Sequence, residues 1–145
     1  MGVTDFDKVR AGGEYAATRL PITFRQEANG VLADASFFTA DRAYTVVAIS
    51  EVHATAATAT AVQHLQVEKC TGTVAAGSGT NLLSDNSGSG IALNAVANTV
   101  QDGTLVTTAG VCDLAAGDRL AIDYSATTAP LAGVQVTVVL TPKES

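Results

Sequence analysis

Residues Gly133 to Thr141 read GVQVTVVLT, the most regular strand pattern in the chain. Every second residue from Val134 to Leu140 is valine or leucine, and most of the residues between them are Gln or Thr. A period of two places the first set on the core-facing side of a strand and the second set on the solvent side. Pro142 has no backbone N–H and ends the pairing. These residues therefore predict a half-buried antiparallel strand.

A second alternating segment, Leu120 to Ser125 (LAIDYS), comes shortly before the first. Its larger apolar residues stand at every other position, and the turn residues Ala116-Gly117-Asp118 introduce it. The two segments suggest a hairpin or two neighbouring strands. Further strands are expected nearer the N-terminus, at Thr18 to Gln26, Val31 to Phe38, Tyr44 to Ala54, Gln63 to Thr71 and Asn98 to Thr107.

Two of these segments differ in how their faces are predicted to be covered. Tyr44 to Ala54 (YTVVAISEVHA) is apolar on both faces, which is typical of a central strand covered twice. Strict alternation gives one face Val46, Ala48 and Val52 and the other face Val47 and Ile49. Gln63 to Thr71 (QHLQVEKCT) instead predicts a strand with one solvent-facing side, which carries His64, Gln66 and Glu68.

Turn-forming residues separate the strand segments, and helical periodicity is nearly absent. Ala75 to Gly90 has the composition of a long surface loop anchored inward by Leu82-Leu83, and Ala92 to Ala97 is the one helix candidate. Strands at a spacing of roughly 8–12 residues are typical of sandwiches and jelly rolls. We therefore expect an all-β fold: an antiparallel β-sandwich or jelly-roll-like single domain over residues 18–145, preceded by an extended N-terminal arm, residues 1–17.

The composition argues against several classes of partner. The 145 residues are 47% hydrophobic and 15% charged, so the chain can bury enough apolar surface to fold. The net charge is −6 and the eight basic residues are scattered, which opposes binding to nucleic acid. No apolar run approaches the ~20 residues of a membrane-spanning helix, and the first ten residues lack the features of a signal peptide. We expect a soluble protein made in the cytoplasm, with neither nucleic acid nor membrane as a partner.

The two histidines are the first place to look for catalysis or metal binding. His53 lies two residues after Glu51 and His64 lies four residues before Glu68, so each pair shares one face of a strand. Such pairs can bind a metal when their strands are adjacent, but no third ligand is indicated. The expected arrangement is a surface histidine near a carboxylate.

The remaining motifs do not indicate a metal-binding, phosphate-binding or catalytic site. Cys70 and Cys112 have no metal-binding spacing; we expect both to be reduced, with a disulfide between them as the alternative. The Asp85 to Gly88 segment lacks the spacing of a calcium loop and predicts a turn. Gly77 to Thr80 is followed by no Lys and lies in no strand-to-helix turn, which argues against a phosphate site. We expect no catalytic residue, no cofactor and no metal, and therefore no enzyme.

Several strand-and-turn segments carry a resemblance to a known family: Phe37 to Thr60 (FFTADRAYTVVAISEVHATAATAT), Val67 to Leu83 (VEKCTGTVAAGSGTNLL), Asn98-Thr99-Val100, Leu114 to Leu120 (LAAGDRL) and Leu131 to Val134 (LAGV). Together they resemble the small decoration, or cement, proteins of tailed-phage (siphophage-like) capsids, over Phe37 to Leu140. No catalytic residue lies among them.

The resemblance implies a structural virion protein. Such a protein is a β-sandwich that is made in the host cytoplasm, sits on the outer surface of the capsid and locks neighbouring capsomers together, commonly as a trimer. Its partners would be the major capsid protein and other copies of itself. Aromatic and Arg side chains are favoured anchors at interfaces, so the arm and its junction supply candidate contacts to the capsid or to a neighbouring protomer. These candidates are Phe6, Val9, Arg10, Tyr15 and Arg19.

A receptor- or glycan-binding module, such as a phage fibre tip, is the alternative, because jelly rolls also serve there. It would need an exposed aromatic platform for stacking on a sugar. The chain has three tyrosines, Tyr15, Tyr44 and Tyr124, and the last two lie in predicted strands. The sequence therefore supplies such a platform poorly.

Overall fold

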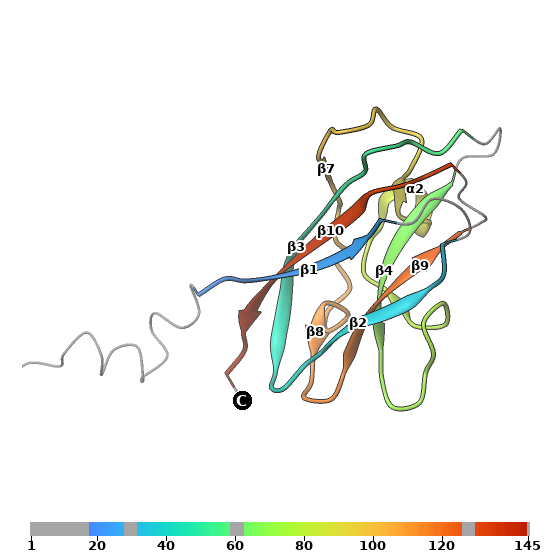
Figure 1. Ribbon diagram of the computed structural model, residues 1–145. Helices are drawn as coiled ribbons and strands as arrows, with labels where there is room; N and C mark the ends of the chain where they lie inside the picture. The colour runs from blue at the N-terminus through green and yellow to red at the C-terminus, as the bar shows by residue number, and fades with distance from the viewer. Residues whose placement is uncertain (1–17, 28–31, 59–62, 126–129, 145) are drawn as a thin grey trace, which may run out of the picture.

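Two five-stranded antiparallel sheets make up the protein in this computed structural model, which describes residues 18–27, 32–58, 63–125 and 130–144 (Figure 1). The first sheet contains, in order, β1 (Leu20–Gln26), β10 (Val134–Pro142) and β3 (Tyr44–Val52), with β7 (Gln101–Asp102) and β8 (Asp113–Leu114) both paired to β3. The second contains β2 (Ala35–Thr39), β9 (Arg119–Tyr124) and β4 (His64–Cys70), with β5 (Thr80–Asn81) and β6 (Ile91–Ala92) both paired to β4.

The strands pair in a nested order. The first strand pairs with the last, β2 pairs with β9, and β3 pairs with β8, all antiparallel. A long hairpin that folds over on itself produces this order, which is that of a jelly roll. The expected all-β sandwich is therefore confirmed. Its core is formed by valine, leucine and isoleucine from both sheets, as the alternation in β9 and β10 predicts.

A β-bulge in β3 changes which of its side chains face the core. Ala48 pairs with Val139 of β10 while Val46 pairs with Leu140, so Val47 is an extra residue with no partner across the ladder. One extra residue reverses the alternation beyond it. The core side of β3 is therefore Tyr44 and Val46 before the bulge, and Ile49 and Glu51 after it. The predicted grouping of Val46 with Ala48 and Val52 is wrong for this reason.

Other sequence predictions have mixed outcomes. Leu82 and Leu83 are fully buried, which confirms the inward anchor of the long loop. The helix candidate at residues 92–97 is wrong, because the chain there forms the end of β6 and successive turns. The one described helix is the four-residue α2 (Asp85–Gly88), a single irregular turn with left-handed Asn86 and Ser87. Within the described residues no helix could cross a bilayer.

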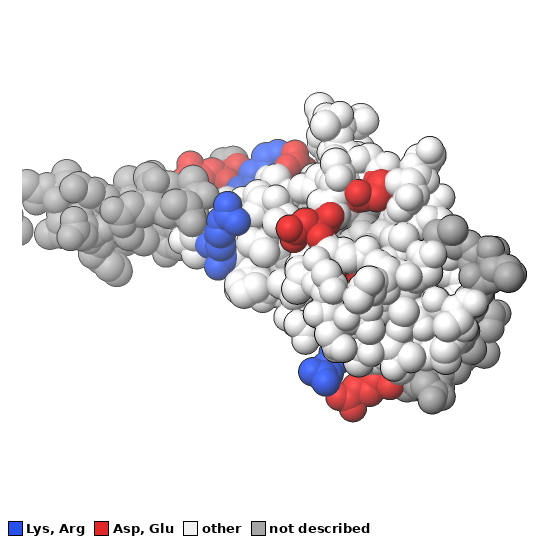
Figure 2. Space-filling model, turned by 90° about the horizontal axis from the view of Figure 1, so that it is seen from above, with Lys and Arg blue, Asp and Glu red and all other residues white. Residues whose placement is uncertain are grey.

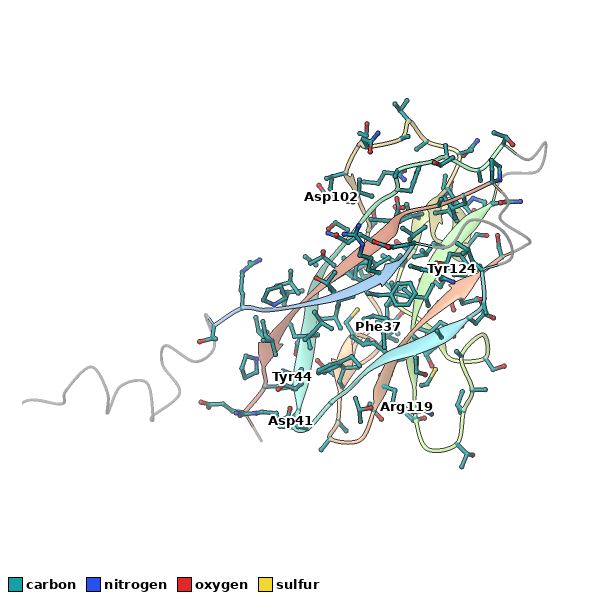
Figure 3. The ribbon with its side chains drawn as sticks, viewed as in Figure 1. Phe37, Asp41, Tyr44, Asp102, Arg119 and Tyr124 are labelled. Carbon is teal, nitrogen blue, oxygen red and sulfur yellow. The ribbon has the colours of Figure 1, made fainter. Side chains whose placement is uncertain are left out.

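The two ends of the sandwich differ in composition. At one end, a backbone hydrogen bond from Ala40 to Asp118 joins the turn after β2 to the turn before β9. A second backbone hydrogen bond joins Lys143 to Ala43. Charged side chains gather there, including Asp41 and Arg119 in Figure 3. At the other end, loops 53–58, 93–100 and 130–133 bond to one another through Ala54–Ala132, Ala57–Leu93 and His53–Asn98 backbone contacts. We call these the charged end and the uncharged end.

Candidate functional site

A fully buried pair of ionisable side chains lies inside the sandwich, below the uncharged end. His53 Nδ1 is 2.9 Å from Glu51 Oε1, and both side chains are fully shielded from solvent. His53 Nε2 lies 3.0 Å from the carbonyl oxygen of Ala95. Gln101 Nε2 donates to Glu51 Oε2 and to the carbonyl of Ala92, each at 2.9 Å. This group joins the end of β3 to β7 and to the loop before it.

The hydrogen bonds fix how the protons of this group are arranged. A carbonyl oxygen can only accept, so His53 Nε2 carries a hydrogen and donates to Ala95. One further proton lies between His53 Nδ1 and Glu51 Oε1, as an ion pair or as two neutral groups. In both cases the pair has no net charge, and its four polar atoms all have partners. No atom is left to act on a substrate, so the group is structural.

The expectation of a surface histidine at His53 is therefore wrong. The bulge at Val47 turns Glu51 inward, and His53 follows two residues later on the same side. The second predicted pair is also not brought together, because Glu68 bonds elsewhere. The solvent-facing side predicted for β4 is in fact covered: Gln66 and Glu68 are each only 2% exposed.

The loop after β4 folds back across the outer face of its own sheet. Glu68 Oε2 accepts hydrogen bonds from the backbone N–H groups of Gly77 and Gly79, and Arg119 donates to the carbonyls of Gly72 and Val74. Burial raises the pKa of Glu68, and the two glycine hydrogen bonds only partly oppose this. The pKa of Asp123, on neighbouring β9, is raised by burial and by Asp34.

These pKa shifts predict that mild acid stabilises the protein. Both carboxyl groups have a higher pKa in the folded chain than their ordinary values of 4.5 for Glu68 and 3.8 for Asp123, so folding favours their protonated forms. The free energy of unfolding should rise as the pH falls from 7 through the raised pKa values. Below the ordinary value of 3.8, protonation of Asp113, whose pKa is lowered, removes stability in turn. Chemical denaturation at a series of pH values measures it.

A substitution isolates the contribution of Glu68. In Glu68→Gln the amide oxygen can still accept from Gly77 and Gly79, but the group no longer ionises. The stability advantage of this variant over the unmodified protein should therefore grow as the pH rises towards 7. Glu144→Gln, at an exposed residue, controls for the loss of one negative charge. Parallel curves for Glu68→Gln and the unmodified protein would contradict the assignment.

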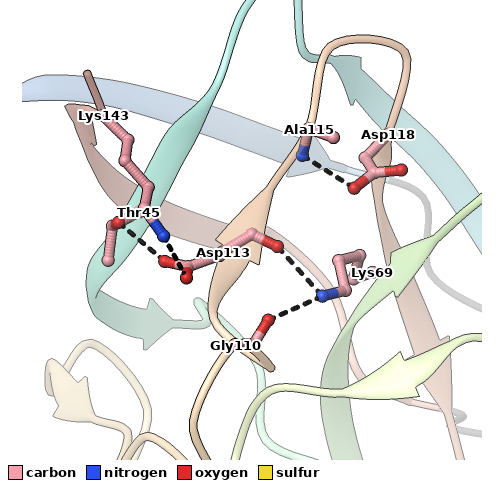
Figure 4. A network of polar contacts seen from close by, with 7 residues as sticks. All are labelled: Thr45, Lys69, Gly110, Asp113, Ala115, Asp118 and Lys143. Atoms are coloured by element: carbon pink, nitrogen blue, oxygen red, sulfur yellow. Dashed lines mark hydrogen bonds and ion pairs between the residues drawn. The ribbon is translucent and has the colours of Figure 1, made fainter. Parts of the chain in front are cut away.

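At the charged end, a second polar network links the two sheets (Figure 4). Lys69 Nζ, from β4, donates to the carbonyls of Gly110 and Asp113 at 3.0 and 2.9 Å. The Asp113 carboxylate accepts from Lys143 and from Thr45, and these two hydrogen bonds lower the pKa of Asp113. Every group in the network bonds to the protein itself, so the network closes this end of the sandwich.

The aromatic side chains of the described residues pack into the sandwich. Tyr44 and Tyr124 are 6% and 7% exposed, and Figure 3 shows them among the side chains between the sheets. Phe24 and Phe37 contact each other with ring centroids 5.5 Å apart, and Phe38 contacts Tyr44. Within the described residues, none of these rings forms an exposed platform on which a sugar could stack.

Cysteine and metal chemistry have no site in the described part of the chain. Cys70 and Cys112 are free in this structure, and burial raises the pKa of both. Their sulfur atoms lie near the carbonyls of Ala75 and Val106. No group of three or more His, Cys, Asp or Glu side chains among the described residues is placed to hold a metal ion.

The uncharged end differs from the rest of the described surface in its lack of charged side chains and in its exposed valines. Its loops 53–58, 93–100 and 130–133 contain no Asp, Glu, Lys or Arg, and exposed Asp102 follows two residues after Val100. Figure 2 looks onto the molecule from this side and shows an area of uncharged side chains with a few acidic side chains beside it. Val96 and Val100 are 77% and 63% exposed there, far more than the other large hydrophobic side chains described. Sequence reasoning missed both valines, although the long gaps between charged residues were a visible signal.

Most of the predicted interface residues cannot be placed. Phe6, Val9, Arg10 and Tyr15 belong to residues 1–17, which lie outside the described part of the chain. Arg19 is exposed and directly precedes β1, whose residue Leu20 pairs with Leu140 near the C-terminal end of β10. Arg19 therefore lies towards the charged end.

Comparison with known proteins gives no relative: no protein-family profile, curated protein or solved structure matches this chain.

Proposed function

We propose that this protein is a structural virion component, a capsid decoration protein that binds the outside of a tailed-phage head as a homotrimer and stabilises the contacts between capsomers. The resemblance of residues 37–140 to that family motivates the proposal. The structural observation that supports it is that the main clusters of ionisable side chains form their hydrogen bonds and ion pairs inside the protein. The Glu51–His53 pair, Glu68 and the Lys69–Asp113–Lys143 network all bond within the sandwich.

Two further features support a binding role over catalysis. Small uncharged side chains lose little conformational entropy when they are ordered against a partner, and they make up most of the uncharged end. A trimer that engages several shell subunits makes its later contacts intramolecular, so modest individual contacts suffice. A glycan-binding role is less well supported, because Tyr44 and Tyr124 are buried.

Electron cryo-microscopy of particles from the source that encodes this chain tests the proposal. We expect density for the jelly roll on the outer surface of the head, in sets of three. Purified heads that lack the chain would refute the proposed function, and so would copies found only at a fibre tip.

The arm residues give a second test of capsid binding. Replacing Phe6 and Tyr15 together by alanine should weaken binding to heads stripped of the protein about tenfold or more, because large aromatic anchors dominate interface energetics. Cosedimentation of the full-length variant with such heads measures the affinity. Thr4→Ala is the matched control within the same segment. Undiminished occupancy would reject a role for these two residues.

A further inference from the structure

Loop 93–100, between β6 and β7, presents its two exposed valines from a firmly held backbone. The N–H of Leu93 donates to the carbonyl of Gln63, and the N–H of Asn98 donates to the carbonyl of His53 at 2.7 Å. The carbonyl of Ala95, between them, accepts from the buried His53 side chain. Asn98 adopts a left-handed conformation with φ of 60°. In Figure 1 this loop forms the top of the molecule, beside the end of β3.

Such a loop is suited to a protein contact. Val96 and Val100 project from it with 77% and 63% of their surface exposed, so burying them against a partner would be favourable. Because these hydrogen bonds already fix the backbone, little ordering entropy remains to be lost on binding. The surrounding loops contribute mainly Ala and Thr, which allow close approach.

We propose that loop 93–100 is a contact between copies of this chain, in which Val96 and Val100 of one protomer pack against the same loop of its neighbours. The charge distribution favours a second copy as the occupant. Each copy carries a net charge of −6, so copies that approach through acidic surfaces repel one another. The three loops of the uncharged end carry no charged side chain, so an approach through them avoids most of that repulsion even though Asp102 is exposed beside loop 93–100. A basic partner would instead be drawn to acidic surfaces elsewhere.

Rotational symmetry removes the need for a separate receptor surface. A residue that lies near a symmetry axis contacts its own copies, so one short apolar loop is enough to form the centre of the contact. The number of copies, three, rests on the proposed function; the location of the contact does not.

Sedimentation velocity of the full chain over a range of concentrations tests the inference. Val96→Asp should weaken self-association about tenfold or more, because it places a charge in an apolar contact. Val96→Thr, which keeps the shape, should weaken it less. Ala116→Asp, which adds the same charge at an exposed position of the charged end, should leave it unchanged. Added salt should strengthen the association of the unmodified protein, because it screens the net repulsion.

The outcomes separate this inference from the proposed function. A chain that stays monomeric, or a Val96→Asp variant that associates as tightly as the unmodified protein, would overturn the inference. A Val96→Asp variant that self-associates normally but no longer binds phage heads would identify the capsid as the occupant instead, and would also overturn it. Association that depends on Val96 in a protein absent from phage heads would leave the inference standing while the proposed function fails.

Discussion

Replacing Glu51 by leucine is expected to lower the free energy of unfolding by about 3–5 kcal/mol, because removing one member of a buried, hydrogen-bonded pair leaves its partner unsatisfied. His53 Nδ1 would lose its only contact, and Gln101 would keep only its hydrogen bond to Ala92. Leucine fills a similar volume, so the loss reports on polar contacts more than on a cavity. Urea denaturation followed by circular dichroism measures it.

Glu51→Gln is the matched variant that separates charge from hydrogen bonding. Its amide N–H can donate to Nδ1 of a neutral His53, and its oxygen can accept from Gln101, while His53 Nε2 still donates to Ala95. Every contact is retained, so the expected loss is about 1 kcal/mol or less. Equal losses in the leucine and glutamine variants would contradict this account and assign the stabilisation to the carboxylate charge. Amide exchange at Asn98 should also accelerate in Glu51→Leu, because its N–H is bonded to the carbonyl of His53.

The sequence predicts the fold class well because its clearest signal is local. The alternation in β9 and β10 reports directly which side chains face the core, and both strands form where they are predicted. Where the alternation is less regular, the observed strand is shorter than the predicted one. The strand predicted at Asn98 to Thr107 contains only the two-residue β7 and an isolated bridge between Leu105 and Leu83. The backbone at Gly103, directly after β7, passes close to Leu83: a Cβ added there would lie 2.5 Å from the Leu83 side chain.

The interior of the candidate site was not predictable in the same way. A bulge depends on the register between two strands, and the residue at the bulge here is Val47, not a glycine that could have indicated one in the sequence. In an apolar run such as residues 46–49, alternation cannot say which face is inside, so the burial of Glu51 and His53 could not be deduced. The burial of Glu68 depends on a long loop folding back over β4, which is a tertiary contact.

Gly90 is the last residue of the segment predicted as a long surface loop, and it directly precedes β6, which pairs with β4. Its φ is +101°, and a Cβ placed there would lie 2.1 Å from the carbonyl oxygen of Leu65. Gly88 provides a control, because it has a φ of +87° and no atom within 4 Å of the same added Cβ. The two glycines therefore share the backbone requirement and differ in the steric one.

Gly88→Ala should accordingly cost about 1–3 kcal/mol of unfolding free energy, the strain of a side chain at positive φ. Gly90→Ala should cost that amount and about 1–3 kcal/mol more, because the backbone must shift to relieve the clash with Leu65. The shift would move β6 away from β4 and so displace loop 93–100, which begins one residue after β6 ends. Urea denaturation of both variants compares the losses, and equal losses would show that the backbone at Gly90 relaxes freely. If the valine contact is correct, Gly90→Ala should also weaken self-association, measured without denaturant under conditions in which the variant is still folded. Gly88→Ala should not weaken it.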